Sequence, residues 1–281
     1  MFRRLSNSWD LVKASAEVLR SDKELVIFPI LSGLATLIVL ATFALPMFLA
    51  GLFDQMVTDG NIQPLGVVVA FLFYLVQYTV IFFSNTALVG AAMIRLRGGD
   101  PTVSDGFRIA SQRIVPILGY ALISATVGMV LRAISERAGL IGRLVVGLIG
   151  FAWTVATYLV VPVLVVENVG PVDAIKRSTE LLKRTWGEQL IGNAGVNAVF
   201  SLISIPVVVI GLGLIFLAVA VESVVAIVLA VVVLILALLA LGVISSTLSG
   251  IYSAAVYRYA AEGEISGAFS AEMIRGAFRR R

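Results

Sequence analysis

The stretch from Leu190 to Tyr257 reads LIGNAGVNAVFSLISIPVVVIGLGLIFLAVAVESVVAIVLAVVVLILALLALGVISSTLSGIYSAAVY, and its one charged residue is Glu222. A helix that crosses the hydrocarbon core of a bilayer needs about 20 mostly apolar residues. The stretch is too long for one such helix, and Glu222 divides it into two halves that are each long enough. The sequence therefore predicts two membrane-spanning helices, 190–218 and 224–257, with a turn at Glu222.

Four more apolar runs precede this stretch and predict spans at 25–52, 65–94, 114–131 and 144–166. Hydrophobic residues make up 59% of the chain and charged residues 14%, whereas a soluble domain carries roughly a quarter charged residues. A chain of this composition needs lipid as its solvent. We predict an all-α, polytopic membrane helical bundle of about six transmembrane helices, which forms a single integral membrane domain over residues 1–281.

Lysine and arginine are distributed unevenly around these spans. Eighteen of the 21 lie in the N-terminal segment, the second and fourth loops and the C-terminal tail, which an even number of spans places on one side. The other three, Arg132, Arg137 and Arg143, lie around the third loop. Because loops rich in lysine and arginine stay in the cytoplasm, we expect a multi-pass protein of the cell (cytoplasmic) membrane with both termini cytoplasmic.

Short amphipathic segments precede the odd-numbered spans, and a fourth closes the chain: 5–21, 102–113, 171–187 and 266–280. Thr102 and Asp105 predict a capping box, and Pro171 suits a first helical turn. Helical spacing predicts the following apolar faces: Leu5, Trp9, Val12, Ala16 and Leu19; Val103, Phe107, Ala110 and Ile114; Val172, Ile175, Thr179, Leu182 and Trp186; Phe269, Met273, Ala277 and Phe278.

These basic helices fall on the predicted cytoplasmic side, where two placements are open. They can lie in the membrane interface with their cations near anionic headgroups, or they can pack on the cytoplasmic end of the bundle, and the two can hold together. Membrane lipids are the expected partners, through candidate headgroup contacts at Lys176, Arg177, Lys183 and Arg184. A homo-oligomer or a membrane protein partner is also open, and no nucleic acid is expected.

Three stretches carry a resemblance to a known family: Ser8–Lys13, Phe28–Gly33 and Gly170–Trp186. They resemble an uncharacterised prokaryotic family of multi-span membrane proteins. That family is distantly similar to the membrane domain found beside some glycerophosphodiester phosphodiesterases. The resemblance implies an integral membrane protein and no catalysis, since those enzymes keep their active site in a separate soluble barrel.

Polar residues within the spans need an explanation, because polar groups are costly in hydrocarbon. Asn85, Asn193 and Asn197 are a candidate intramembrane polar site, which would line a pathway or hold a lipid headgroup. Hydrogen bonding between helices is the favoured alternative, and Gln77 belongs to the same class. At the end of the fourth span, Glu167 is expected to pair with a following lysine or arginine.

Two further sequence features bear on how the spans pack and bend. Small residues recur every fourth position in the last span, a stripe that permits close contact between helices, within the bundle or at a homodimer seam: Gly242, Ser246, Gly250 and Ala254. Pro162 lies inside the fourth span, where it removes a backbone donor and is expected to kink the helix.

The composition bears directly on function. Cysteine and histidine are both absent, which removes thiol nucleophiles and thiolate or imidazole metal sites. The carboxylates stand mostly alone, so we expect no enzyme, no cofactor and no metal. A non-enzymatic membrane component that organises lipid or a partner protein at the cytoplasmic leaflet is the favoured function. A small-molecule or lipid transporter is the alternative, with Asn85, Asn193 and Pro162 as the residues to suspect.

Overall fold

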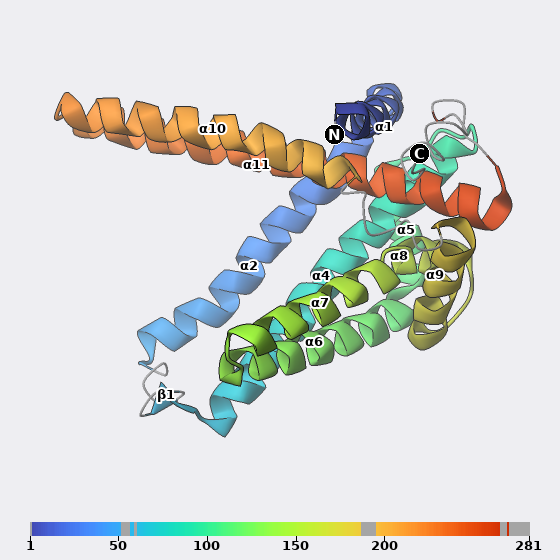
Figure 1. The fold of residues 1–281 in the computed structure, drawn as a ribbon, viewed down its shortest axis with the longest axis horizontal. Coiled ribbons are helices and arrows are strands. Elements are labelled where there is room, and N and C mark those ends of the chain that lie inside the picture. Colours follow the sequence, from blue (N-terminus) through green and yellow to red (C-terminus); the bar gives the residue numbers. More distant parts are fainter. Residues whose placement is uncertain (1, 52–56, 59–60, 187–194, 265–268, 270–281) are drawn as a thin grey trace. The chain divides into compact units, whose positions relative to one another are not determined.

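The structure is a computed structural model (Figure 1), and it describes residues 2–51, 57–58, 61–186, 195–264 and 269. Six helices in this part of the chain are long and apolar enough to cross a membrane: Lys23–Leu49, Pro64–Leu96, Ile114–Arg137, Leu140–Val166, Phe200–Ala220 and Val224–Glu262. The predicted all-α polytopic membrane protein with six spans is confirmed.

The chain separates into two compact units, which are described one at a time. Unit 1 contains Met1–Val26, Ala92–Asp100 and Trp186–Arg281, and unit 2 contains Ile27–Ala91 and Pro101–Thr185. The C-terminal segment predicted at 266–280 lies outside the described residues, except for Phe269, which is buried.

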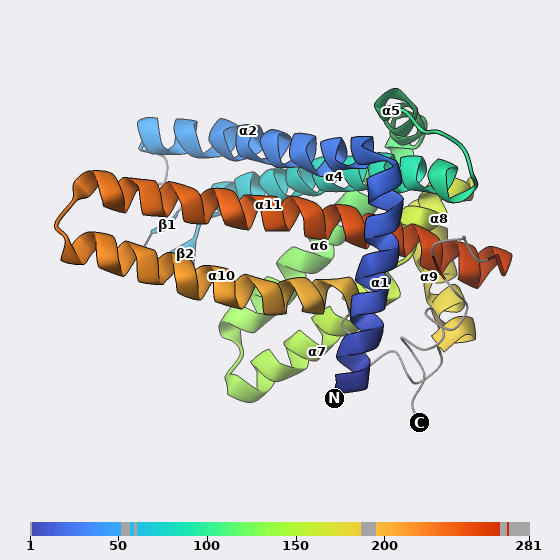
Figure 2. The same ribbon diagram turned by 90° about the horizontal axis from the view of Figure 1, so that it is seen from above.

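Unit 1 is built around the last two spans. Helices α10 (Gly195–Ala220) and α11 (Val224–Tyr257) form a hairpin (Figure 2), and α1 (Phe2–Ser21) contacts both of them. The two spans approach closely at Gly211, where an added Cβ would lie 2.4 Å from Cδ1 of Leu234. A 3₁₀ turn, η1 (Lys23–Val26), follows α1, and a π-helical turn, η3 (Arg258–Glu262), follows α11.

The turn between α10 and α11 forms where the sequence predicts it. Glu222 has a positive φ of 53°, the left-handed conformation that ends many helices. Ser223 then caps α11, because its Oγ accepts a hydrogen bond from the N–H of Ala226 at 3.3 Å. The one charge of the long apolar stretch therefore lies at the hairpin turn, as expected.

Unit 2 contains the other four spans and two of the predicted amphipathic helices. Its elements are α2 (Ile27–Leu49), a two-residue antiparallel pair of strands β1 (Val57–Thr58) and β2 (Asn61–Ile62), most of α4 (Pro64–Leu96), α5 (Val103–Gln112), α6 (Ile114–Arg137), α7 (Leu140–Ala156), α8 (Val160–Val166) and α9 (Pro171–Trp186). Helix α6 runs six residues beyond the expected end at 131, so Arg132 and Glu136 are helical.

The fourth span is broken into α7 and α8, as Pro162 suggests. A proline removes the hydrogen bond to the carbonyl four residues earlier and its ring clashes there, and here the helix stops at Ala156 and restarts at Val160. The N–H of Leu159 donates instead to Oγ of Ser178 on α9 at 3.0 Å, within the protein interior. Helix α9 therefore satisfies a backbone group that the break leaves without a helical partner.

Helices α5 and α9 bury a face within unit 2. The capping box of Thr102 and Asp105 is present at the start of α5, and α9 begins at Pro171, so both predictions are confirmed. Gly106 on α5 lies so close to Phe28 that a Cβ would meet its ring at 2.4 Å. Packing on the bundle, one of the two placements left open, therefore accounts for the faces of these helices that are buried.

The buried faces of α1 and α9 are rotated from the predicted ones. On α9 the buried residues include Ala174 and Ser178, whereas Val172 is 53% exposed. On α1 they include Ala14 and Ser15, whereas Trp9 is 45% exposed. The buried faces combine small residues with bulky ones, such as Leu11 on α1 and Leu181 on α9. The exposed residues of the predicted faces remain accessible to acyl chains, the other placement that the sequence leaves open.

Candidate functional site

Unit 2 contains a cavity of about 430 Å³ between α2, α4 and α6, within the roughly 300–1,000 Å³ range of small-molecule sites. Its lining is mostly aliphatic and aromatic: Leu40, Phe43, Ala44 and Met47 on α2; Gly66, Val67, Val69, Ala70, Phe73 and Tyr74 on α4; Met129, Arg132, Ala133 and Glu136 on α6. An apolar cavity between membrane-spanning helices is suited to an apolar ligand.

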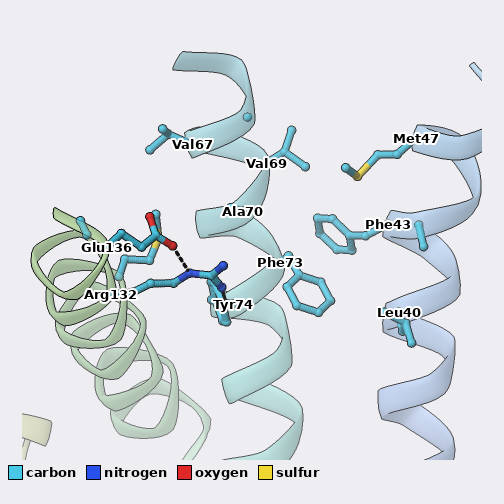
Figure 3. Close-up of a pocket in the computed structure, with 14 residues that line it drawn as sticks. Leu40, Phe43, Met47, Val67, Val69, Ala70, Phe73, Tyr74, Arg132 and Glu136 are labelled. Atoms are coloured by element: carbon cyan, nitrogen blue, oxygen red, sulfur yellow. Dashed lines mark hydrogen bonds and ion pairs between the residues drawn. The ribbon is translucent and has the colours of Figure 1, made fainter. Parts of the chain in front are cut away.

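The cavity lies at one end of the three spans. Its residues come from the last turns of α2, the first turns of α4 and the last turns of α6. Successive spans run in opposite directions, so these ends meet on the side away from α5 and α9. In Figure 3, Phe43 and Met47 extend from α2 toward Phe73 and Val69 on α4.

The polar groups of the cavity gather at α6. Nε of Arg132 donates to Oε1 of Glu136 at 2.8 Å, and Nη1 of Arg132 donates to the hydroxyl of Tyr74 at 2.9 Å. Figure 3 shows both α6 side chains reaching toward α4, with the guanidinium beside Tyr74. The side chains of Arg132 and Glu136 are 64% and 52% exposed. One end of the apolar cavity thus carries a cation, an anion and a phenol.

A column of aromatic rings supports the α4 wall. Phe43 meets Phe73 edge-on at 5.5 Å between ring centroids. From the cavity inward, Tyr74, Tyr78 and Phe82 stack at the four-residue spacing of one helix face, and Phe82 stacks on Tyr120 of α6 at 4.4 Å. Aromatic pairs of this kind contribute about 0.5–1.5 kcal/mol each beyond their buried area. They hold α4 and α6 at a fixed separation beside the cavity.

Sequence reasoning missed this site. Arg132 served only as a charge for assigning the orientation, and Glu136 was not considered. The sequence does contain one sign of this ion pair. The two residues are four apart at the end of an apolar helix, where a charge without a partner would be costly. What the sequence does not indicate is the third helix, α2, that closes the apolar wall.

The predicted intramembrane polar residues do not gather in this cavity. Gln77 on α4 donates through Nε2 to Oγ1 of Thr36 on α2 at 2.8 Å, which confirms interhelical hydrogen bonding for that residue. Asn85 is half-buried in α4. Asn193 lies outside the described residues, and Asn197 lies in α10 with a side chain outside them.

The candidate headgroup contacts lie on α9. Lys176 is exposed and pairs with Asp173 at 3.3 Å, and Lys183 is exposed. Nε of Arg177 donates to Oε1 of Glu167 at 3.0 Å, which confirms the ion pair predicted at the end of the fourth span. Arg184 belongs to α9, but its side chain lies outside the described residues.

The small-residue stripe of α11 changes character along its length. Gly242 and Ser246 are exposed, Gly250 is half-buried and Ala254 is buried. An added Cβ at Gly242 would meet no described atom within 4 Å. Packing within the protein therefore accounts for the end of the stripe nearest Ala254, and the homodimer seam stays a prediction for the exposed end.

Unit 1 holds a second group of charges, at the ends of α4 and α11. Arg258 is 5% exposed and donates to the carbonyl of Leu96 and to the carboxylates of Glu262, at 3.3 Å, and Glu264. Nη2 of Arg97 donates to the other oxygen of Glu262 at 2.6 Å. The sequence places Arg258 in the tail, but the structure places it inside the protein with carboxylates around it.

Asp22, in the same unit, has a carboxyl group that is almost fully buried. Burial raises the pKa of Asp22, and the nearby guanidinium of Arg95 opposes this effect without overcoming it. In unit 2 the pKa of Asp105 is lowered instead, because the hydroxyl and N–H of Thr102 donate to its carboxylate in the capping box.

A protein-family model matches residues 64–268 of the chain, well over half of its length, and its description is "Family of unknown function (DUF6159)". The chain belongs to this family. The DUF6159 region contains the α4 and α6 walls of the cavity, whereas the α2 wall precedes it. No curated protein matches the chain. Nothing supports the distant likeness to the membrane domain of glycerophosphodiester phosphodiesterases.

Proposed function

We propose that this protein is a non-enzymatic component of the cell membrane that binds and organises lipid, with part of one lipid in the cavity between α2, α4 and α6. The observation that carries the proposal is the composition of that cavity, whose described lining is apolar along the walls and carries its charged residues at one end. This pattern matches an amphipathic molecule, whose chain prefers the apolar walls and whose headgroup prefers the ion pair.

The cytoplasmic helices support the same function at the other membrane surface. Lys176 and Lys183 on α9 are exposed, and so is the ion pair of Lys176 with Asp173. Both ammonium groups are therefore accessible to anionic headgroups while the buried face of α9 stays packed. Attraction of this kind is worth about 1 kcal/mol per basic residue near an anionic surface. Both termini are cytoplasmic in this proposal, as the loop charges predict.

Native mass spectrometry of the protein, gently extracted from its own membrane, tests the proposal. We expect a bound phospholipid in about one-to-one ratio. Ala44→Phe should lower the bound fraction about tenfold, equivalent to roughly 1.4 kcal/mol, because the new ring fills the cavity. Ala41→Phe is the matched control, since Ala41 is exposed one turn away on α2 and does not line the cavity.

Each other outcome contradicts the proposal in a different way. If the wild-type protein retains no lipid, or if both variants lose lipid equally, the cavity is not a lipid-binding site. A bound non-lipid molecule that Ala44→Phe displaces would favour the transporter alternative. A second protein at a fixed ratio, without lipid, would favour a role in holding a protein partner.

A further inference from the structure

The charged end of the cavity has a feature that an ordinary lipid pocket does not need. Arg132 and Glu136 carry opposite charges, lie one helical turn apart on α6, and are the two charged residues among the described residues that line the cavity. Their charges sum to zero. A headgroup that meets this end therefore finds both a guanidinium and a carboxylate within reach.

We propose that the lipid headgroup taken by this site is zwitterionic, a phosphodiester joined to a primary amine, with the phosphate at Arg132 and the ammonium at Glu136. The inference rests on the proposed function, since it requires a lipid chain in the cavity. It names the chemical class of the ligand, which the cavity walls alone do not specify.

The phosphate is assigned to Arg132 because of the donors that remain on its guanidinium. Its two contacts use Nε and one hydrogen of Nη1, and a guanidinium carries further N–H groups in a planar fork that matches phosphate oxygens. The hydroxyl of Tyr74 already accepts from Nη1, so its own hydrogen can be donated to the same phosphate. The α4 side chain thus adds a second donor.

The ammonium is assigned to Glu136 because an ionised carboxylate only accepts hydrogen bonds. Its Oε1 receives the Arg132 contact, and the carboxylate has capacity for further donors. A primary ammonium supplies three, whereas a quaternary ammonium supplies none. A headgroup with a phosphate and no amine would leave the carboxylate facing the phosphate, and like charges placed together are disfavoured. The pair therefore favours an ethanolamine headgroup over glycerol or choline.

The exposure of the pair agrees with a role in binding. About half or more of each side chain is exposed, so both groups are accessible from the cavity mouth. Arg137 is also exposed at the end of α6 but does not line the cavity. It provides a matched control, because Arg137→Gln removes one positive charge near the same surface and leaves the pair intact.

Competition between headgroups tests the inference. The purified protein is equilibrated in mixed micelles that contain equal amounts of phosphatidylethanolamine, phosphatidylglycerol and phosphatidylcholine with identical acyl chains, and bound lipid is identified by native mass spectrometry. We expect the ethanolamine lipid to exceed each of the others about tenfold in the wild type. Glu136→Gln should abolish this preference, Arg132→Gln should lower retention of all three, and Arg137→Gln should change neither.

The outcomes separate this inference from the proposed function. If the wild type retains the three lipids equally and Ala44→Phe releases them all, the headgroup assignment is overturned and the lipid site stands. If the glycerol lipid is preferred and Arg137→Gln removes that preference, the total positive charge at the end of α6 determines which lipid binds. The headgroup assignment is then overturned. If no lipid is retained, both fail. The wild-type competition decides by itself if a variant does not fold.

Discussion

Two Arg–Glu pairs in this protein have the same four-residue spacing and opposite surroundings. In unit 1, the side chain of Arg258 is 6% exposed beside Glu262, and in unit 2 the side chain of Arg132 is 64% exposed beside Glu136. Arg258 also contacts Glu264 and the carbonyl of Leu96, while Glu262 also contacts Arg97. The buried pair is enclosed by further partners, and the exposed pair borders a cavity.

The difference shows what burial does to a charge. A buried ion without enough partners is strongly destabilising, so the charges around Arg258 act to hold the ends of α4 and α11 together. An exposed pair contributes little to stability, about 0–1 kcal/mol, and so it can exchange partners at small cost. On this basis the first pair is structural and the second is available to a ligand.

The largest expected effect concerns the side of the membrane on which each pair lies. Helix α6 is the third span and α11 is the sixth, so the predicted topology puts the C-terminal end of α6 outside the cell and that of α11, like α9, in the cytoplasm. The chain has no cysteine, which allows single reporters on a clean background. A membrane-impermeant thiol reagent should label Gly139→Cys, after α6, in intact cells and should label Lys176→Cys only after lysis. The reverse pattern would invert the predicted orientation.

The next effect compares the stability that each pair contributes. Glu262→Gln leaves the buried guanidinium of Arg258 with fewer partners and should lower the free energy of unfolding by about 3 kcal/mol, the lower end for a broken buried pair because Glu264 remains. Glu136→Gln should cost less than about 1 kcal/mol. Reversible denaturation in mixed micelles measures both. Equal losses would show that burial does not distinguish the pairs.

A buried hydrogen bond between two uncharged groups shows how much stability burial accounts for when no charge is involved. Ser178→Ala removes the acceptor of the Leu159 N–H at the break in the fourth span. A buried donor left unsatisfied costs about 1–3 kcal/mol, so this variant should rank between the two glutamate variants. Ser21→Ala is the control, since Ser21 is exposed and its hydroxyl donates to the carbonyl of Glu17 within α1; its change should stay within about 0.5 kcal/mol. A silent Ser178→Ala would mean that water fills the break.

The smallest effects come from two aspartates whose pKa values shift in opposite directions. The lowered pKa of Asp105 means that its carboxylate stabilises the fold above pH 3.8 and loses this contribution as the pH falls through its lower folded value. Asp105→Ala should therefore lower the unfolding temperature at pH 7, and the difference should shrink at acid pH.

The raised pKa of Asp22 gives the opposite sign. Its protonated form stabilises the fold at acid pH, and this contribution is lost as the pH rises from 3.8 through the higher folded value. Asp22→Asn should therefore raise the unfolding temperature slightly at pH 7 and have less effect in acid. Thermal scans of both variants between pH 3 and pH 7 check the signs; a loss of stability in Asp22→Asn at pH 7 would contradict the burial of that charge.

Helices α5 and α9 show how far sequence patterns alone can predict the structure. The positions of α5 and α9 follow from apolar spacing, a capping box at Thr102 and a proline at Pro171, because these features act locally. Their contacting faces also include small residues such as Gly106, Ala174 and Ser178, which carry little hydrophobic signal. Ser178 lies at a contact where its hydroxyl accepts from the N–H of Leu159, a backbone group in the break between α7 and α8.

The sequence by itself determined that this is a six-span membrane protein, because each span must satisfy its own backbone within lipid and must therefore consist of about 20 apolar residues. It also determined the hairpin turn at Glu222, which follows from one charge in a long apolar stretch. The tertiary structure decided which charges are enclosed and which are open to a ligand. Arg258 and Arg132 have the same local pattern, and only contacts with distant residues make one of them part of the interior and the other part of a cavity.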